Sequence, residues 1–326
     1  MGNWGVGMSE DDDAGQDDLV TEEMLWDRIP EVEGADRAST YYELSARIYA
    51  RGQYDEALAL AETARDIYSG LGSSASSEGL AQAYSAIGYN LNQLKRMDEA
   101  ATAMSQAVDI LRANKSPIAL ELACTLGEWW YSSKNYSKVI ETMEECAQEH
   151  LLDGSEIGAA NDLYLVGCAH RELKSYDAAI TSFTHARSLF KKCREVIHVA
   201  RCDQKMAACH IELEHGEIAL HAARKALDVF ETAHDHRRET FALLEYGKAQ
   251  ILLGRLEEGL ATFEQVVQTA TDEEPRDFEL IVDVETRMAA VMRSQGRIEA
   301  ADEILRRLAS VSEVLGEFLG EQEDSA

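Results

Sequence analysis

Residues 166–186 read VGCAHRELKSYDAAITSFTHA, and residues 206–226 read MAACHIELEHGEIALHAARKA. The two stretches align without a gap, so that Ala219 stands 40 residues after Ala179. The first half of each carries a small residue, such as Gly167, where a second helix can come close. The second half carries small or aromatic residues at a four-then-three step, which places them on one face of a helix. The sequence therefore predicts two helical hairpins in succession.

The same pattern returns along most of the chain. Counterparts of Ala179 recur at separations near 40 residues, and the residue twelve positions before each of them is small. Small residues favour close helix crossings, because a large side chain would hold the two backbones apart. We therefore expect seven stacked hairpins. The counterparts are Ala57, Ala100, Val139, Ala219, Gly259 and Ala301, and the small residues are Ser45, Gly88, Gly127, Gly167, Ala207, Gly247 and Ala289.

The composition favours an all-α protein. The 326 residues include only 3 prolines, and 45% of the residues are hydrophobic without the alternation that is typical of β-strands. The longest apolar runs fall short of the roughly 20 residues that a membrane-spanning helix needs. The acidic start also lacks the basic residues of a secretory signal. We expect a soluble, cytoplasmic protein.

The charge is strongly acidic, with 31 Lys and Arg residues against 60 Asp and Glu residues and a formal net charge of −29. Most of such a surface would repel nucleic-acid phosphates and anionic lipids, so we expect a protein or peptide partner and neither a nucleic acid nor a membrane. Residues 187–205 reverse this balance locally, with six basic residues against two acidic ones. This stretch is either an ordinary solvated helix end or a docking site for an acidic segment.

The repeated pattern resembles the tetratricopeptide repeat. The resemblance covers residues 39 to about 310, with a period near 40 where the family usually has 34, and is similar to longer-helix variants of that family. It implies an α-solenoid of about seven hairpins that forms a right-handed superhelix, with the first helices lining a concave groove. The best-matching residues are Gly52, Tyr54, Glu56 and Ala57, Gly88, Met97, Glu99 and Ala100, Gly127 and Tyr136, and Gly247, Gly254, Glu258 and Phe263.

The expected organisation is a disordered acidic tail over 1–19, a short helix and linker over 20–38, the repeat array over 39–320 and an acidic tail over 321–326. The short helix is expected over Val20 to Ile29, with Pro30 ending it. The last helix is expected from about Ile298 to Leu319. It either caps the array or pairs with a second copy to form a homodimer.

By analogy with the family, one stripe of each first helix faces the groove. Tyrosines and amides dominate the stripe in the first copies, and apolar and basic residues dominate it in the later ones. Both kinds of residue suit contacts with a peptide segment. Packing between neighbouring repeats is the alternative for part of the tyrosine stripe, for Phe241 and for Ile251. The predicted partner-binding residues are Tyr42, Tyr49, Tyr89, Asn92, Tyr131, Tyr164, Arg171, Arg201, Phe241, Leu244 and Lys248.

The chemistry of a catalytic site is not visible in the sequence. It contains no phosphate-binding glycine loop, no nucleophile elbow and no HExxH motif, so we expect no enzymatic activity, no cofactor and no metal. The 6 cysteines form no CxxC pair and suit small buried thiols in a reducing compartment. Cys168, His170, Cys209 and His210 occupy near-equivalent places in adjacent repeats, where zinc binding is the alternative to burial in a helix interface.

Three functional hypotheses follow. The favoured one is a non-enzymatic scaffold that binds a peptide segment or a partner protein, with an amphipathic or acidic segment, in the groove. The second is a peptide sensor that changes shape when its ligand binds and then controls a partner protein. In the third, the acidic start of the chain or the helix near its beginning occupies the groove.

Overall fold

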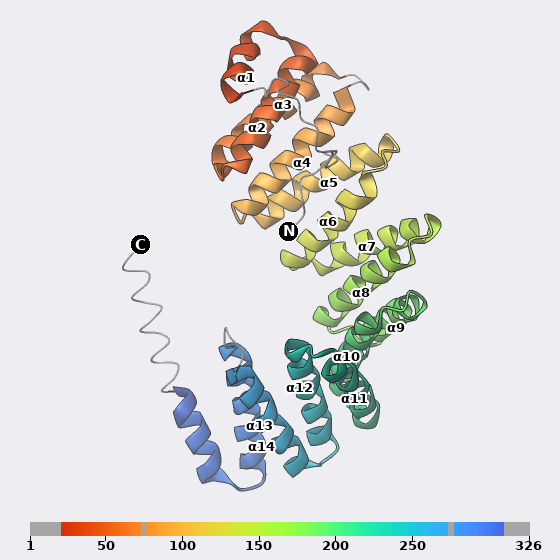
Figure 1. Cartoon of the computed structure of the whole chain (residues 1–326), viewed down its shortest axis with the longest axis vertical. Coiled ribbons are helices and arrows are strands. Elements are labelled where there is room, and N and C mark those ends of the chain that lie inside the picture. The colour runs from red at the N-terminus through yellow and green to blue at the C-terminus, as the bar shows by residue number, and fades with distance from the viewer. Residues whose placement is uncertain (1–20, 73–75, 273–276, 310–326) are drawn as a thin grey trace. The chain divides into compact units, whose positions relative to one another are not determined.

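The computed structural model describes residues 21–72, 76–272 and 277–309. All secondary-structure elements within these residues are helical, which confirms the prediction of an all-α fold (Figure 1). The predicted tails over 1–19 and 321–326, and the predicted last helix beyond residue 309, lie outside the described residues. Within the described part of the chain, none of the helices combines the length and the apolar character that crossing a membrane requires.

The chain divides into two compact units, residues 1–133 and residues 134–326. The helices described in unit 1 are α1 (Glu22–Arg28), the 3-10 helix η1 (Ile29–Glu31), α2 (Gly34–Ala50), α3 (Tyr54–Leu71), α4 (Ser77–Gln93), α5 (Met97–Ala113) and α6 (Ala119–Ser132). Those described in unit 2 are α7 (Tyr136–Leu152), α8 (Glu156–Glu172), α9 (Tyr176–Lys192), α10 (Val196–Glu212), α11 (Gly216–Ala233), α12 (His236–Leu252), α13 (Leu256–Asp272), α14 (Phe278–Ser294) and a helix over 298–309.

The helix expected near the start of the chain is present as α1. Thr21 caps it, because its side-chain oxygen accepts a hydrogen bond from the backbone N–H of Met24 at 3.2 Å. Leu25 of α1 is fully buried in a cluster that includes Leu44 and Ile48 of α2, so the short helix is fastened to the first hairpin. The first helix of the first hairpin, α2, begins at Gly34, within the range over which a short helix and linker are expected.

The recurring small residues mark helix crossings, as their pattern indicates. A Cβ atom added to Gly167 of α8 would lie 2.7 Å from Cδ1 of Phe183 in α9, and one added to Gly247 of α12 would lie 2.8 Å from Cδ1 of Phe263 in α13. Both distances are too short for ordinary contact, so only glycine leaves room for the ring. The counterparts of Ala179 are likewise buried in every copy. Close packing between the two helices of a hairpin therefore explains the repeat pattern.

Each hairpin turn contains one residue in the left-handed backbone region, five positions before the buried counterpart of Ala179. Glycine fills this position in some copies, but Lys or Glu fills it in others, although a side chain costs roughly 1–2 kcal/mol there. In the turn after α8, Lys174 has a φ of 58°, and its N–H donates to the carbonyl of Arg171 at 2.9 Å. The turn geometry is therefore common to all copies even where glycine is missing. The residues are Gly52, Lys95, Lys134, Lys174, Glu214, Gly254 and Gly296.

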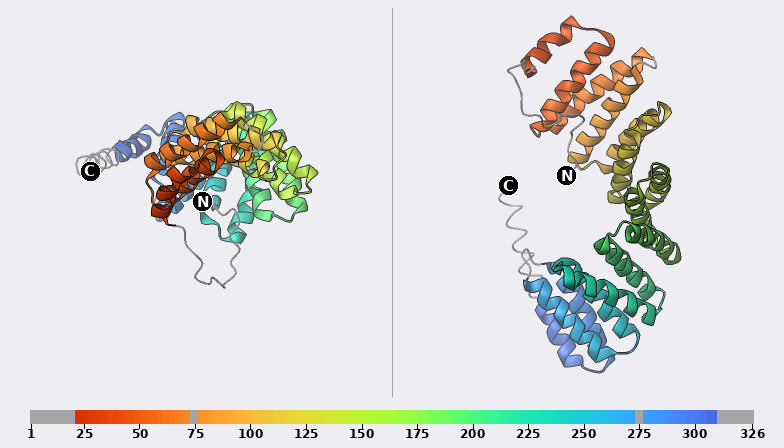
Figure 2. Two further views of the ribbon diagram at one scale, coloured as in Figure 1. Left: turned by 90° about the horizontal axis from the view of Figure 1, so that it is seen from above. Right: turned by 45° about the vertical axis from the view of Figure 1, so that its right-hand side comes forward.

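Unit 2 is a stack of antiparallel helical pairs, which Figure 2 shows from two further directions. Its second helices α9, α11 and α13 begin at Tyr176, Gly216 and Leu256, each 40 residues after the one before. The first helices form a layer of their own, since α10 contacts both α8 and α12. This layer carries the residues that we predicted to bind a partner.

Candidate functional site

The predicted residues of unit 1 lie on its first helices and are half-buried. Tyr49 of α2 accepts a hydrogen bond from Nε2 of Gln93 in α4 at 3.0 Å. Tyr89 of α4 packs edge-on against Trp129 of α6, with 5.2 Å between the ring centroids. Burial raises the pKa of Tyr42 and of Tyr89 above the ordinary value of 10.0. These tyrosines therefore join neighbouring repeats and present only part of their surface to a partner. Asn92 of α4 and Tyr131 of α6 are half-buried as well.

Two of the predicted residues of unit 2 belong partly or wholly to its core. Leu244 of α12 is only 5% exposed and packs in a cluster with Leu260 and Phe263 of α13, so its side chain is not available on the surface. Phe241 and Ile251 pack against the same cluster, and both are half-buried. Leu244 is therefore a core residue, contrary to its prediction as a partner contact, and the packing alternative accounts for much of the surface of Phe241 and Ile251. Their helix is rotated so that the apolar stripe turns towards α13 and α14.

Arg201 and Tyr164 form the best-defined contact among the predicted residues. The guanidinium carbon Cζ of Arg201 in α10 lies over the ring of Tyr164 in α8, 4.6 Å from its centroid. Tyr164 is itself held by Phe183 of α9, with 5.5 Å between the ring centroids. Burial, with the nearby Cys168 as a smaller cause, raises the pKa of Tyr164 well above its ordinary value of 10.0. Arg201 is therefore oriented by a neutral and firmly packed aromatic ring.

Three further cations lie in the same layer of first helices. Lys205 follows Arg201 by one turn of α10, and its pKa is lowered, first by burial and then by the charge of Arg171 on α8. Arg171 is ion-paired with Glu172 at 2.7 Å. On α12, Lys248 is ion-paired with Glu245 at 3.2 Å, and Glu245 partly offsets the effect of the arginines on Lys205. We call Arg171, Arg201, Lys205 and Lys248 the basic face of unit 2.

The basic stretch over residues 187–205 is divided between two layers. Arg187 of α9 is ion-paired with Asp203 at 2.9 Å, and Lys192 lies 3.3 Å from Glu156. Burial raises the pKa of Asp203, whereas the charge of Arg187 lowers it, and the burial effect is the larger one. Only Arg201 and Lys205 from this stretch belong to the basic face. The docking interpretation therefore applies only to these two residues of the stretch. The basic face also contains Arg171 of α8 and Lys248 of α12, which lie outside the stretch and could not be grouped with it from composition.

The thiols near the basic face are buried and uncharged at neutral pH. Burial raises the pKa of Cys202 to about 12 and that of Cys209 to about 11, so both thiols are protonated at neutral pH. Among the residues that the structure describes, Cys168, His170, Cys209 and His210 do not gather their ligand atoms into one metal-sized group. Their arrangement favours the interpretation as thiols and histidines of a helix interface.

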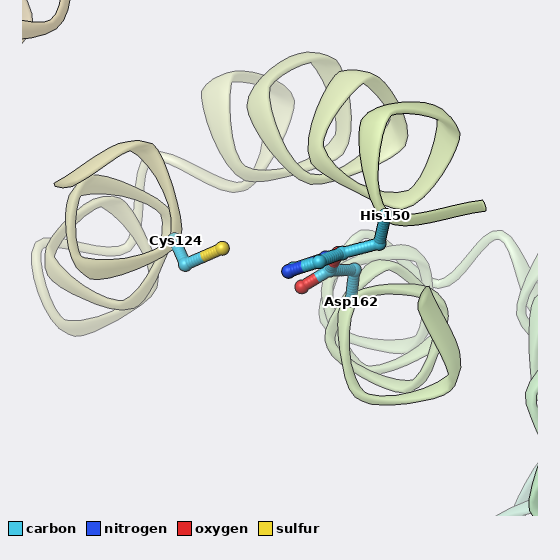
Figure 3. A group of neighbouring side chains, drawn as sticks. All are labelled: Cys124, His150 and Asp162. Carbon is cyan, nitrogen blue, oxygen red and sulfur yellow. The ribbon is translucent and has the colours of Figure 1, made fainter. Parts of the chain in front are cut away.

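A buried polar contact joins α7 to α8 near the start of unit 2. Nδ1 of His150 lies 2.6 Å from Oδ2 of Asp162, and Asp162 is only 3% exposed (Figure 3). A Cβ atom added to Gly158 would lie 2.7 Å from Cδ2 of His150, so the glycine makes room for the imidazole. The contact satisfies a carboxylate that would be costly to bury alone. The repeat pattern did not indicate this pair, because both residues lie outside the repeated packing positions.

An apolar cavity lies at the other end of unit 2, and the sequence analysis did not predict it. Its volume is about 320 Å³. The only charged residues of its lining are Glu285 and Arg307, which form an ion pair with each other. The cavity lies between α13, α14 and the helix over 298–309. Its lining is mainly apolar, whereas the basic face is charged. It is lined by Val267, Thr271, Phe278, Ile281, Val282, Glu285, Arg307 and Leu308.

Comparison with known families agrees with this fold. Two family models, both described as tetratricopeptide repeat, match residues 81–114 and residues 241–270. The first range covers most of α4 and α5, and the second covers most of α12 and α13, so each match corresponds to one hairpin. These two hairpins are tetratricopeptide repeats, and the other hairpins share their pattern of small and buried residues. No curated protein matches its sequence.

Several solved structures are similar to the chain in fold. A signal transduction ATPase with numerous domains and a tetratricopeptide repeat sensor, from Pyrococcus horikoshii, is 17% identical with a TM-score of 0.63; the similarity covers 93% of this chain and 45% of that one. The apo form of RapI is 13% identical with a TM-score of 0.54 and coverage of 86% and 99%. A Rap protein complexed with competence and sporulation factor is 15% identical with a TM-score of 0.53 and coverage of 85% and 76%. At these identities the similarity concerns the fold alone, and this chain spans less than half of the ATPase.

Proposed function

We propose that this protein is a non-enzymatic interaction scaffold that binds a segment of a partner protein along the first helices of its repeats. Repeat arrays present extended surfaces whose shape is fixed by packing, so a partner segment can bind without ordering the array itself. The basic face of unit 2 and the half-buried tyrosines of unit 1 are the contact regions in this proposal.

The observation that carries the proposal is a difference between two positions of the repeat. The position twelve residues before each buried counterpart of Ala179 is small and buried in every copy. The position eight residues before it is accessible in every copy, and its chemistry changes from aromatic to amide, basic and aliphatic. Packing therefore restricts the first position to small residues, whereas the residue type at the second position varies from copy to copy, which suits recognition. The accessible residues are Tyr49, Asn92, Tyr131, Arg171, Ile211, Ile251 and Arg293.

Site-specific photo-cross-linking in cells tests the proposal. A photoreactive phenylalanine analogue replaces Tyr131 or Tyr164 on a first helix, or Ile218 on the second helix α11, where the side chain is 54% exposed. We expect the first two positions to cross-link to the same partner protein, identified by mass spectrometry, and Ile218 to give no cross-link to it. Recovery of that protein equally from all three positions, or from none, would contradict the proposed function.

The second candidate is a sensor that changes shape when a peptide binds. The observation that favours it is the division of the chain into two compact units, because shape changes in switching proteins commonly occur as movements of compact units. Small-angle scattering of the full chain, with and without the partner segment found by cross-linking, separates the candidates. A decrease in the radius of gyration supports a sensor, and an unchanged profile supports a static scaffold.

A further inference from the structure

We propose that the basic face of unit 2 binds the carboxylates of an acidic segment of a partner protein, with Arg201 and Lys205 as the principal contacts. This inference rests on the proposed function and specifies the chemistry of the partner at one part of the array. It concerns residues of α10 and of α8 and α12, the two helices of the same layer that α10 contacts within a single unit.

Arg201 and Lys205 lack acidic partners in the part of the chain that the structure describes. Within residues 21–72, 76–272 and 277–309, neither Arg201 nor Lys205 forms an ion pair with a carboxylate. Comparable cations of the same unit do have such partners, for example Arg187 with Asp203 and Arg224 with Asp228. The donors of Arg201 and Lys205 can bind carboxylates supplied by another protein.

The side chain of Arg201 is oriented by its contact with Tyr164. Its guanidinium lies over the ring of Tyr164 at 4.6 Å, so the group is held in place before any ligand arrives. A guanidinium that stacks on a ring still directs its N–H donors outwards in its own plane, where a carboxylate can accept two of them. Because the side chain is already ordered, binding costs less conformational entropy than it would for a mobile arginine.

The cations of the basic face also repel one another. Burial is the largest cause that lowers the pKa of the half-buried Lys205, and the charges of Arg171 and, to a smaller extent, Arg201 lower it further. Glu245 offsets this effect only partly, since it is also ion-paired with Lys248. A bound carboxylate would remove the repulsion and stabilise the charged form of the lysine. Such a site gains more from an anion than an isolated surface lysine does.

A short acidic segment fits this site better than a long polyanion does. The basic face is a local exception on a chain with a net charge of −29. A nucleic acid or an anionic membrane would extend beyond the face and meet the surrounding acidic surface, which repels it. A peptide with a few carboxylates over a short length contacts the basic face alone.

Fluorescence anisotropy with the purified full chain tests the inference. The probe is a short labelled peptide rich in Asp and Glu, and the control peptide has Asn and Gln at the same positions. We expect only the acidic peptide to bind, with an affinity that decreases as salt is added. The double variant Arg201→Gln with Lys205→Gln should lower the affinity roughly tenfold or more. Circular dichroism must show that this variant retains its helices and remains folded at the temperature of the binding assay.

The matched control changes two cations outside the basic face. Lys191→Gln with Lys192→Gln alters the net charge equally, at exposed positions near the end of α9. We expect this variant to change the affinity by less than about twofold, because exposed charges are screened. Equal losses in the two double variants would show a nonspecific charge effect and overturn the inference. Arg201→Lys, which keeps the charge and loses the planar group, should give an intermediate loss.

Two other outcomes would also overturn the inference. The first is that the acidic peptide does not bind at all. In that case the proposed function is still supported if the photoreactive residue at position 131 cross-links to a partner protein in cells. Binding that is seen only after residues 1–20 are removed would identify the acidic start of this chain as the occupant in place of a partner protein.

Discussion

The guanidinium of Arg201 and the ring of Tyr164 join two consecutive repeats across the first-helix layer of unit 2, at a Cζ-to-centroid distance of 4.6 Å. The contact combines packing and recognition in one place. Tyr164 belongs to the repeat before, where Phe183 supports it, and Arg201 presents its charge on the surface of the next repeat. A stacked cation of this kind is worth about 0.5–2 kcal/mol, depending on how far water is excluded.

A double-mutant cycle measures this contact. We expect Arg201→Gln and Tyr164→Leu to destabilise the protein by less together than the sum of their separate effects, with a coupling of about 0.5–2 kcal/mol. The measurement is chemical denaturation followed by circular dichroism. The control cycle pairs Tyr164→Leu with Arg224→Gln, since Arg224 lies on α11 and is ion-paired with Asp228. A coupling in the control as large as that of the first pair would show that the contact is not specific.

The helix crossings predict opposite effects of one substitution at two glycines. Gly167→Ala should lower the free energy of unfolding by about 1–3 kcal/mol, because the new methyl group would meet Phe183 at 2.7 Å. Gly70 lies in α3 with no atom within 4 Å of a Cβ, so Gly70→Ala should leave stability unchanged or raise it by up to about 1 kcal/mol through helix propensity. Thermal melts of both variants provide the test, and similar destabilisation by both would contradict the crossing argument.

The left-handed turn positions predict a reciprocal pair of substitutions. Lys174→Gly should stabilise the protein by about 1 kcal/mol, because glycine adopts a φ of 58° without the steric cost that a side chain brings. Gly254→Ala should destabilise it by a similar amount, since Gly254 has a φ of 76° and open space around its Cα. The denaturant concentration at the midpoint of unfolding, measured for both variants and the unsubstituted chain, tests these two changes. If both variants shifted stability in the same direction, backbone conformation would not be the cause.

The buried thiols predict a loss of stability at alkaline pH. Burial raises the pKa of Cys202 from its ordinary value of 9.0 to about 12 in the folded protein. Above pH 9 the unfolded chain loses this proton while the folded chain keeps it, so the stabilising contribution is fully present below pH 9 and decreases as the pH rises towards 12. The slope for one such group is about 1.4 kcal/mol per pH unit.

Unfolding free energies measured from pH 8 to pH 11 check this prediction. Cys202→Ala should show a shallower decrease than the unsubstituted chain, although its stability at pH 8 is lower because of the cavity. Cys193→Ala is the control, since Cys193 is only half-buried at the end of α9. An identical pH dependence for Cys202→Ala and the unsubstituted chain would contradict the assignment of a raised pKa.

Much of the fold could be predicted from the sequence, because its packing positions repeat. Gly167 and Gly247 stand where helices cross, and Ala179 and Ala219 are buried as the pattern indicates. The left-handed turn positions could be predicted only where glycine occupies them, as at Gly254. At Lys174 the backbone adopts the same conformation against its local preference, since packing of the two helices on either side decides the geometry.

Less of the candidate site could be predicted. The sequence by itself determined the repeat, its small and buried packing positions and the local excess of basic residues, because these properties depend on spacing and composition along one chain. Only the tertiary structure decided that Leu244 is a core residue and that Lys205 lies beside Arg171. The rotation of each helix about its own axis depends on the side chains of its neighbours. A stripe counted by residue spacing therefore cannot distinguish a position that faces solvent from one that faces the next helix.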